Sequence, residues 1–352
     1  MIPAGRPTAA AAGDLPTGTG HAPCHHGELL QGVFLDGDGR RCAGLVTLPM
    51  AGPGSSAEFL RRPGTEPGAL TVRPAGRTKA ARAAALAVAH CAERTGQPPC
   101  GGELRLTGDV PVGLGMGSST SDVIATVRAV ADSYGRRLAP DTIARLAVRA
   151  ELASDPLMLD ARPALFAQRE GRVLEVLGPA LPPLVVVGCA LGGGAPVDTL
   201  SLPVRPPAET ADDDVRAYER LRTLLRRAVA TGDVPLLGEV ATASAWRGRQ
   251  ALGHPEFDAL TSIARRAGAV GVQIAHSGSV AGVLFDPAAP GLRYRVRSCL
   301  RALDSHGIPA TRTFTTSTST STKEIPDGPA RGGGRRPAGP DTSRRPARLP
   351  AL

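Results

Sequence analysis

Apolar residues recur at regular spacings along most of the central part of this chain of 352 residues. Spacings of three and four residues, ended by glycine or proline, predict amphipathic helices. The predicted helices cover 79–94, 118–134, 141–151, 212–231, 235–249 and 256–267. Alternating or short continuous apolar runs between turn residues predict strands. These strands cover 27–34 (a strand or a loop), 45–48, 103–107, 184–187, 271–275 and 280–285, which together with the helices indicates a mixed α/β class.

Local signals mark the ends of several elements. Gly96 and Gly135 supply the stops of the first two helices, and Asp141 is expected to be the N-cap of the third. The two ends of the chain lack such patterns: residues 1–19 are mainly Ala, Gly, Pro and Thr, and residues 315–352 pass from Ser-Thr repeats into a basic tail rich in Pro, Gly and Arg. Because neither composition can form a packed core, both ends are predicted to be disordered.

Composition and charge exclude several classes of function. The formal net charge is +9, but residues 323–352 carry seven basic and three acidic residues, so +4 of that charge lies in the tail. Aromatic residues make up only 3%, too few for a base-stacking platform, and nucleic acid is therefore not an expected partner. The longest apolar runs, 181–190 and 280–285, are too short to cross a membrane, and no secretion signal opens the chain. A cytoplasmic protein is expected, with six reduced cysteines that form no Cys-x-x-Cys pair.

The most informative segment is Pro-Val-Gly-Leu-Gly-Met-Gly-Ser-Ser-Thr-Ser-Asp at 111–122, which joins three glycines to hydroxyl residues at a helix start. Without Cβ atoms, Gly113, Gly115 and Gly117 allow positive φ and the close approach of an anion, and free N–H groups of the following helix point at it. The Lys of a Walker-type loop and the spacing of a dinucleotide fingerprint are both missing. A phosphate site is therefore predicted, the alternative being an ordinary flexible connection between a strand and a helix.

Three motifs together resemble a known superfamily. The glycine-rich segment is similar to the phosphate loop of the GHMP kinases, small-molecule kinases that include galactokinase and the homoserine, mevalonate and phosphomevalonate kinases. Cys-His-His-Gly-Glu-Leu-Leu-Gln-Gly at 24–32 and Ile-Ala-His-Ser-Gly-Ser-Val-Ala-Gly at 274–282 resemble motifs of the L-threonine kinases of cobalamin and propanediol metabolism. The resemblance covers roughly residues 20 to 310. It implies ATP-dependent phosphorylation of L-threonine to O-phospho-L-threonine, by a monomer or a homodimer.

The fold implied by this resemblance is α+β and has two domains. An N-terminal ATP-binding domain of residues 20–165 contains a left-handed β-α-β unit, and a ferredoxin-like C-terminal domain spans residues 166–314. The active site is expected in the cleft between them. The resemblance assigns ATP to Pro111, Gly113, Leu114, Gly115, Met116, Gly117, Ser118, Ser119 and Thr120. It assigns Mg²⁺ to Ser119 and Glu151, with Ser118 as an alternative hydroxyl and with a surface glutamate as the alternative for Glu151.

The same resemblance names residues for the acceptor. Asp155 is the candidate base for the proton of the substrate hydroxyl, and Asp160 is the lesser candidate; for Asp155 the alternative is an N-cap before the next proline. Substrate-binding candidates are Glu28, Gln31, His276, Ser277, Gly278 and Ser279. For His276 the alternative is a core histidine, and for 277–279 it is a plain hairpin turn.

His25 and His26 mark a departure from the motif, because a small residue and a cysteine usually precede Gly-Glu-Leu. This departure concerns the acceptor more than phosphoryl transfer, so a kinase of another hydroxy acid or amino alcohol is a second hypothesis. A GHMP-fold regulator that binds a small molecule without catalysis is a third, although the intact glycines and serines argue against it. Cys24, His25, His26 and Cys42 could form a zinc site on paper, but neighbouring histidines of an extended segment point in different directions.

Overall fold

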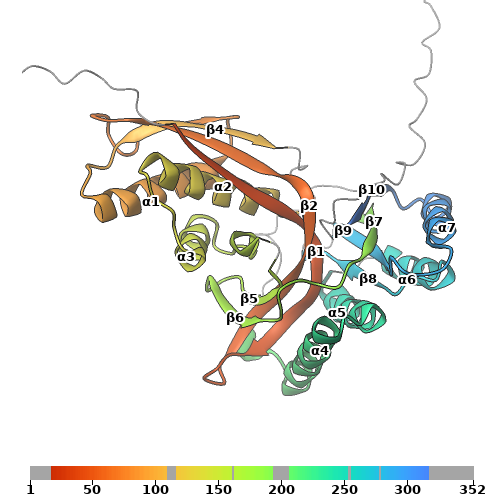
Figure 1. Cartoon of the computed structure of the whole chain (residues 1–352). Helices are drawn as coiled ribbons and strands as arrows, with labels where there is room; N and C mark the ends of the chain where they lie inside the picture. The colour runs from red at the N-terminus through yellow and green to blue at the C-terminus, as the bar shows by residue number, and fades with distance from the viewer. Residues whose placement is uncertain are drawn as a thin grey trace, which may run out of the picture.

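The computed structural model describes residues 17–108, 116–160, 162–192, 206–252, 255–276 and 279–316. These residues form a sheet of ten strands with helices packed against it (Figure 1). The strands are β1 (Gly18–Leu35), β2 (Arg41–Arg62), β3 (Leu70–Arg73), β4 (Gly101–Gly108), β5 (Ala164–Ala167), β6 (Arg172–Val176), β7 (Val185–Ala190), β8 (Gly271–Ile274), β9 (Val280–Phe285) and β10 (Ala310–Thr315). The α-helices are α1 (Thr78–Thr95), α2 (Ser118–Ser133), α3 (Pro140–Glu151), α4 (Asp212–Thr231), α5 (Val234–Leu252), α6 (Glu256–Arg266) and α7 (Leu292–Ser305).

Two long antiparallel strands, β1 and β2, dominate the N-terminal half. Helices α1, α2 and α3 lie together on one side of these strands (Figure 1), and a core of mainly alanine, valine and leucine side chains fills the space between. Strands β3 and β4 pair in parallel with α1 as their connection. This is the β-α-β unit that the resemblance implies.

Strand β1 begins two residues inside the segment that was predicted to be a disordered leader. At Gly18 a Cβ would lie 2.1 Å from the carbonyl oxygen of Ala129 on α2, so only glycine lets the strand touch the helix here. The next residue, Thr19, donates its backbone N–H to the Asp132 carboxylate at 2.8 Å. Tertiary contact with α2 therefore orders a start that composition alone marks as unstructured. Residues 1–16 of the predicted leader lie outside the described residues.

The C-terminal half is built on four strands joined by helices. In the sheet these strands stand in the order β10-β7-β9-β8, and every neighbouring pair is antiparallel. Numbered along the chain, the order is fourth, first, third, second, which is that of a β-α-β-β-α-β ferredoxin-like domain. The predicted ferredoxin-like architecture is therefore confirmed. Helices α6 and α7 pack on this sheet around a core that includes Phe257, Ile263 and Leu303.

A third hydrophobic cluster joins the two halves. Leu29 and Leu30 of β1 belong to it together with Leu225 of α4 and Leu237 of α5. Within the sheet, β1 meets β8 through one residue pair, Glu28 with Ile274. The expected domain boundary at residues 165 and 166 falls inside β5, which pairs with both β2 and β6. The N-terminal motif at 24–32, which contains Glu28, Leu29 and Leu30, thus lies where the two halves meet.

Local signals placed most helices well, with one correction. Asp141 is not the N-cap of α3: the helix starts at Pro140 with Ala139 as its cap, and Asp141 lies in the first turn. The fixed φ of proline suits the first helical position, which explains the earlier start.

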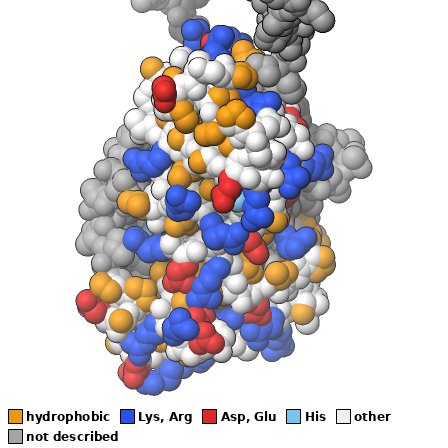
Figure 2. Space-filling model, turned by 90° about the vertical axis from the view of Figure 1, so that its left-hand side faces the viewer, with side chains coloured by type: hydrophobic (Ala, Val, Ile, Leu, Met, Phe, Trp, Pro, Cys, Tyr) orange, Lys and Arg blue, Asp and Glu red, His pale blue; other side chains and the backbone are white. Residues whose placement is uncertain are grey.

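None of the described helices is long and apolar enough to cross a membrane. All six cysteines are buried and none of them forms a disulfide. On the face in Figure 2 basic side chains are interspersed with acidic ones.

Candidate active site

The predicted phosphate site lies at the N-terminus of α2, which the structure describes from Met116 onward. Pro111, Gly113, Leu114 and Gly115 lie outside the described residues. Gly117 takes a φ of +69° and is the N-cap of the helix. Ser121 donates its N–H to the carbonyl oxygen of Gly117 at 2.8 Å, which closes the first turn of the helix. The N–H groups of the preceding Ser118, Ser119 and Thr120 therefore remain at the helix end, where an anion would be stabilised.

Ser119 and Glu151, the predicted magnesium ligands, are brought together. The Ser119 hydroxyl donates to Glu151 Oε2 at 3.3 Å, and Oε1 of the same carboxylate is buried without a hydrogen-bond partner among the described residues. Glu151 is only 3% exposed, which excludes a surface glutamate. Burial and the charge of Asp155 raise the pKa of Glu151 to about 7. Hard oxygen atoms, one of them lacking a partner, fit a magnesium ion.

Asp155 faces His25, which lies 130 positions away in the sequence. His25 Nε2 is 3.0 Å from Asp155 Oδ2, and His25 Nδ1 is 3.3 Å from the carbonyl oxygen of Gly27. Although burial disfavours its charged form, the charges of Asp155 and Glu28 raise the pKa of His25 to about 9. Burial also disfavours the charged form of Asp155, but His25 outweighs it and holds the pKa of this carboxyl below its ordinary value. The two side chains therefore form an ion pair at neutral pH.

Glu28, a predicted substrate residue, is buried beside this pair. Its side chain lies with Oε1 3.8 Å from His25 Nδ1, while Oε2 has no hydrogen-bond partner among the described residues. Burial raises the pKa of Glu28 to about 8, although the charge of His25 acts in the opposite direction. His25, Glu28 and Asp155 thus form one coupled cluster, with ligand atoms within 4.8 Å of one another, in which burial favours the uncharged form of Glu28.

His26 points away from His25 and takes part in a different contact. Its Nδ1 accepts a hydrogen bond from Gln273 Nε2 at 2.7 Å, which places the ring proton on Nε2, and the ring packs 5.2 Å from that of Phe314. Burial and the charge of His25 lower the pKa of His26 to about 4, so this histidine is neutral. The two histidines have separate partners, and Cys42 contacts Asp36 instead, so the zinc site considered from the sequence does not form.

Gln31 and His276, two further predicted substrate residues, contact each other. Gln31 Oε1 accepts a hydrogen bond from His276 Nδ1 at 3.0 Å, and Gln31 Nε2 donates to the carbonyl oxygen of Ile274 at 3.4 Å. His276 is exposed, so it is not a core histidine. Ser279 is buried, whereas Ser277 and Gly278 lie outside the described residues.

Asp160, the lesser candidate base, is directed elsewhere. Its carboxylate pairs with Arg128 at 3.1 Å, and its side chain is 69% exposed. Asp155 is not an N-cap either, because Pro156 holds the cap position of the short 3-10 helix Leu157–Leu159, which has no side-chain cap bond. Of the two candidates, Asp155 is the one that the fold places against a buried cation.

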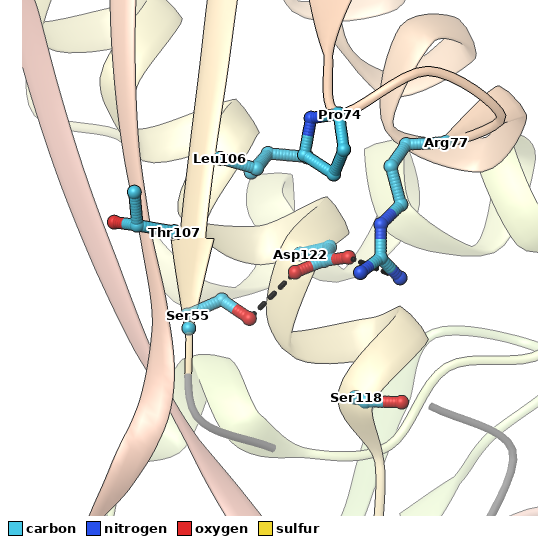
Figure 3. A pocket seen from close by; sticks show the side chains of 8 residues that line it. Ser55, Pro74, Arg77, Leu106, Thr107, Ser118 and Asp122 are labelled. Atoms are coloured by element: carbon cyan, nitrogen blue, oxygen red, sulfur yellow. Dashed lines mark hydrogen bonds and ion pairs between the residues drawn. The ribbon is translucent and has the colours of Figure 1, made fainter. Parts of the chain in front are cut away.

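A pocket of about 280 Å³ lies beside the N-terminus of α2 (Figure 3). Its lining residues are Ser55, Pro74, Arg77, Leu106, Thr107, Gly108, Ser118 and Asp122. The Arg77 guanidinium lies 3.2 Å from Asp122 Oδ2, and the Ser55 hydroxyl donates to Asp122 Oδ1 at 2.6 Å. Both oxygens of Asp122 are thereby engaged, whereas a guanidinium has five N–H donors, so Arg77 keeps donors for an anionic ligand.

Sequence reasoning missed Arg77 and Asp122. The sequence did carry a signal for Asp122, because it is an aspartate on a helix face that otherwise holds apolar and hydroxyl-bearing residues. In the structure this aspartate is only 8% exposed. Three successive residues connect the parts of the site: Gly117 touches His25, Ser118 lines the pocket and Ser119 bonds to Glu151. A ligand whose phosphates lie at this helix end would therefore reach from the pocket toward Asp155.

Two family models match parts of this chain. Residues 80–167 match the family model described as GHMP kinases N terminal domain, and residues 224–302 match GHMP kinases C terminal. The chain is 28% identical over 177 residues to an L-threonine kinase of Citrobacter freundii and 29% identical over 177 residues to one of Salmonella typhimurium. These alignments cover 50% of this chain and only 60% and 57% of the two relatives.

The solved structures show the same fold. A homoserine kinase from Cytophaga hutchinsonii aligns with a TM-score of 0.61 and 16% identity, over 89% of this chain and 97% of that one. The two family models, in their expected order on a fold shared with a solved kinase, show that this chain belongs to the GHMP kinases.

Proposed function

We propose that the protein is an ATP-dependent kinase that phosphorylates the hydroxyl of L-threonine, giving O-phospho-L-threonine and ADP. The observation that carries this proposal is the ionised Asp155, held by His25 beside a helix N-terminus suited to phosphate. The choice of acceptor rests on the likeness to the two L-threonine kinases. The fold does not choose between acceptors, because it is shared with a homoserine kinase.

In the proposed reaction, the acceptor oxygen forms a bond to the γ-phosphorus while the bond from that phosphorus to the β,γ-bridging oxygen breaks. The electron pair of the broken bond leaves with ADP, and the hydroxyl proton passes to the Asp155 carboxylate. Since His25 holds the pKa of Asp155 low, this carboxylate is a weak base. It accepts the proton late, after bond formation to phosphorus has made the hydroxyl acidic, and positioning the acceptor is its larger contribution.

The phosphates of ATP would be held by the first turn of α2 and by the free donors of Arg77. Ser119 and Glu151 would hold magnesium, which neutralises charge on the phosphate oxygens when it is bound. Gln31 and His276 offer an amide and an imidazole that would contact the ammonium and carboxylate groups of the acceptor.

A substrate screen tests the proposal. The full chain with ATP and MgCl₂ is offered L-threonine, L-serine, L-homoserine or mevalonate, with ADP release and the ³¹P NMR spectrum of the product as readouts. L-Threonine should exceed L-serine in kcat/KM by about 10–200-fold, the discrimination that one methyl group provides. Faster turnover of mevalonate or L-homoserine would overturn the threonine assignment. Tight binding of ATP without ADP release for any acceptor would favour the regulator instead.

A further inference from the structure

The contacts of His25 determine its protonation state. Nε2 faces a carboxylate oxygen of Asp155 at 3.0 Å, and Nδ1 faces the carbonyl oxygen of Gly27 at 3.3 Å. Carboxylate and carbonyl oxygens only accept hydrogen bonds, so both ring nitrogens must carry a proton for both contacts to be made. With Asp155 ionised, these two contacts together require an imidazolium.

Among the described residues, one other base acts on Asp155, His276, and burial lowers the pKa of that histidine. The His25 ring is 2% exposed, and a Cβ on Gly117 would lie 2.4 Å from it, so α2 meets it with bare backbone. Several charged or titratable groups act on His25 or on its partner Asp155. On β1 these are Glu28 and His26. From the end of α3 onward they are Glu151 and Asp155 itself, and between β8 and β9 the group is His276. His26 is neutral, and Glu28 and Glu151 supply no positive charge. The charge on His25 is the one that balances Asp155 at contact distance.

We propose that protonated His25 is a positioning residue of the kinase, which holds the Asp155 carboxylate ionised and oriented, and that loss of the His25 proton sets the alkaline limit of turnover. The inference rests on the proposed function in so far as Asp155 receives the acceptor proton. It assigns a role to one of the two histidines by which this chain departs from the threonine-kinase motif.

The direction of the pH effect follows from the sign of the shift. The pKa of His25 is raised to about 9, so the ion pair is complete at neutral pH and is lost as the pH rises through that value. Without the imidazolium, Asp155 loses its orienting partner and Glu28, once ionised, repels it. Turnover should fall about tenfold per pH unit above the pKa of a single required proton. The opposite sign, a rise of kcat above pH 9, would contradict the proposal.

Kinetics of three variants separate this role from a structural one. His25→Lys keeps the charge and should retain measurable kcat, with its alkaline limb moved upward because lysine titrates higher. His25→Gln removes the charge and should lower kcat by about 10²-fold, part of what a general base contributes, with little change in the KM for ATP. His26→Gln is the matched control: it alters a neutral buried histidine, so it should leave the alkaline limb in place even if it lowers the Tm. Because an amino acid ammonium also titrates in this range, the comparison is between variants on one acceptor.

A second measurement needs no substrate. In protein labelled with ¹⁵N-histidine, the ring resonances report protonation at each nitrogen, and the His25 ring is the one missing from the His25→Gln spectrum. We expect this ring to be doubly protonated at pH 8 in the unaltered protein and to titrate lower in Asp155→Asn. A neutral His25 ring at pH 7.5 would overturn the inference whatever the acceptor is. If no acceptor is phosphorylated but the ring is doubly protonated, the proposed function fails and the ion pair stands.

Discussion

A single methyl group placed on Gly117 should damage both stability and turnover. Gly117 has a φ of +69°, where an alanine costs about 1–2 kcal/mol. Its Cβ would also lie 2.4 Å from His25 Cδ2 and 2.5 Å from Nε2, well inside the 3.4 Å of ordinary contact, so the ring must retreat by roughly 1 Å. Overpacking of this kind adds about 1–3 kcal/mol, and the two effects together give a loss of about 2–5 kcal/mol for Gly117→Ala.

Gly96 provides a matched control for the backbone part of this cost. It ends α1 with the same φ of +69°, but a Cβ there would meet no atom within 4 Å. Gly96→Ala should therefore lose only about 1–2 kcal/mol and keep its kcat. In Gly117→Ala the His25 ring would move Asp155 with it, and a displacement of about 1 Å costs about 10²-fold in kcat. Urea unfolding and steady-state kinetics measure both quantities. Equal stability loss in the two variants, with unchanged kcat in Gly117→Ala, would refute the argument that glycine is needed for this contact.

Further outcomes can be checked on the same protein. Asp155→Asn should lower kcat by about 10²–10⁴-fold while retaining nucleotide binding in calorimetry, and a loss confined to nucleotide affinity would indicate a metal or structural role. Because the pKa of Glu151 is raised to about 7, protons compete with metal below that pH. Magnesium affinity, measured with ADP by calorimetry, should thus rise from pH 6 to pH 8, and Glu151→Gln should abolish that dependence. Arg77→Met should raise the KM for ATP by about tenfold or more with kcat unchanged, since charge-assisted hydrogen bonds to phosphate contribute about 1.5–3 kcal/mol; an unchanged KM would remove Arg77 from the nucleotide site.

The helices were predictable because their signals are local. The predicted spans 79–94 and 118–134 differ by one residue at most from the ends of α1 and α2. Helical spacing and a glycine near the end of each span carry that information without any tertiary contact. Helix α7 was not predicted, although Val296, Cys299 and Leu303 are its buried residues at helical spacing, because arginines separate them.

Glycines near the start of the chain show what local signals leave open. In sequence, Gly18 and Gly20 favour disorder or a turn, yet in the fold they bring β1 against the backbone of α2. A glycine permits a flexible segment and a close backbone contact equally well. Which of the two occurs depends on whether another element, here α2, packs against it.

The sequence predicted which residues belong to the site, but not which side chains contact one another there. The motifs placed Ser119, Glu151 and Asp155 in one region of the chain, and the fold brings the first two into contact. Whether a histidine is charged, however, depends on which carboxylate folding brings to it. His25 and His26 are adjacent and chemically identical, yet one faces Asp155 and the other an amide, so their pKa values move in opposite directions.

The cluster that joins the two halves also bears on how the chain emerges during synthesis. Leu29 and Leu30 of β1 are fully buried, and Leu225 of α4 and Leu237 of α5 complete their cover. A ribosome adding about 5–20 residues per second needs roughly 10–40 s to reach Leu225 after Leu30, a separation of roughly 195 residues. During that interval the apolar face of the longest early hairpin has no cover from α4 or α5. Residues 80–167 and 224–302 are thus separate as sequence modules, yet the burial of Leu29 and Leu30 is complete only after α4 and α5 have been synthesised.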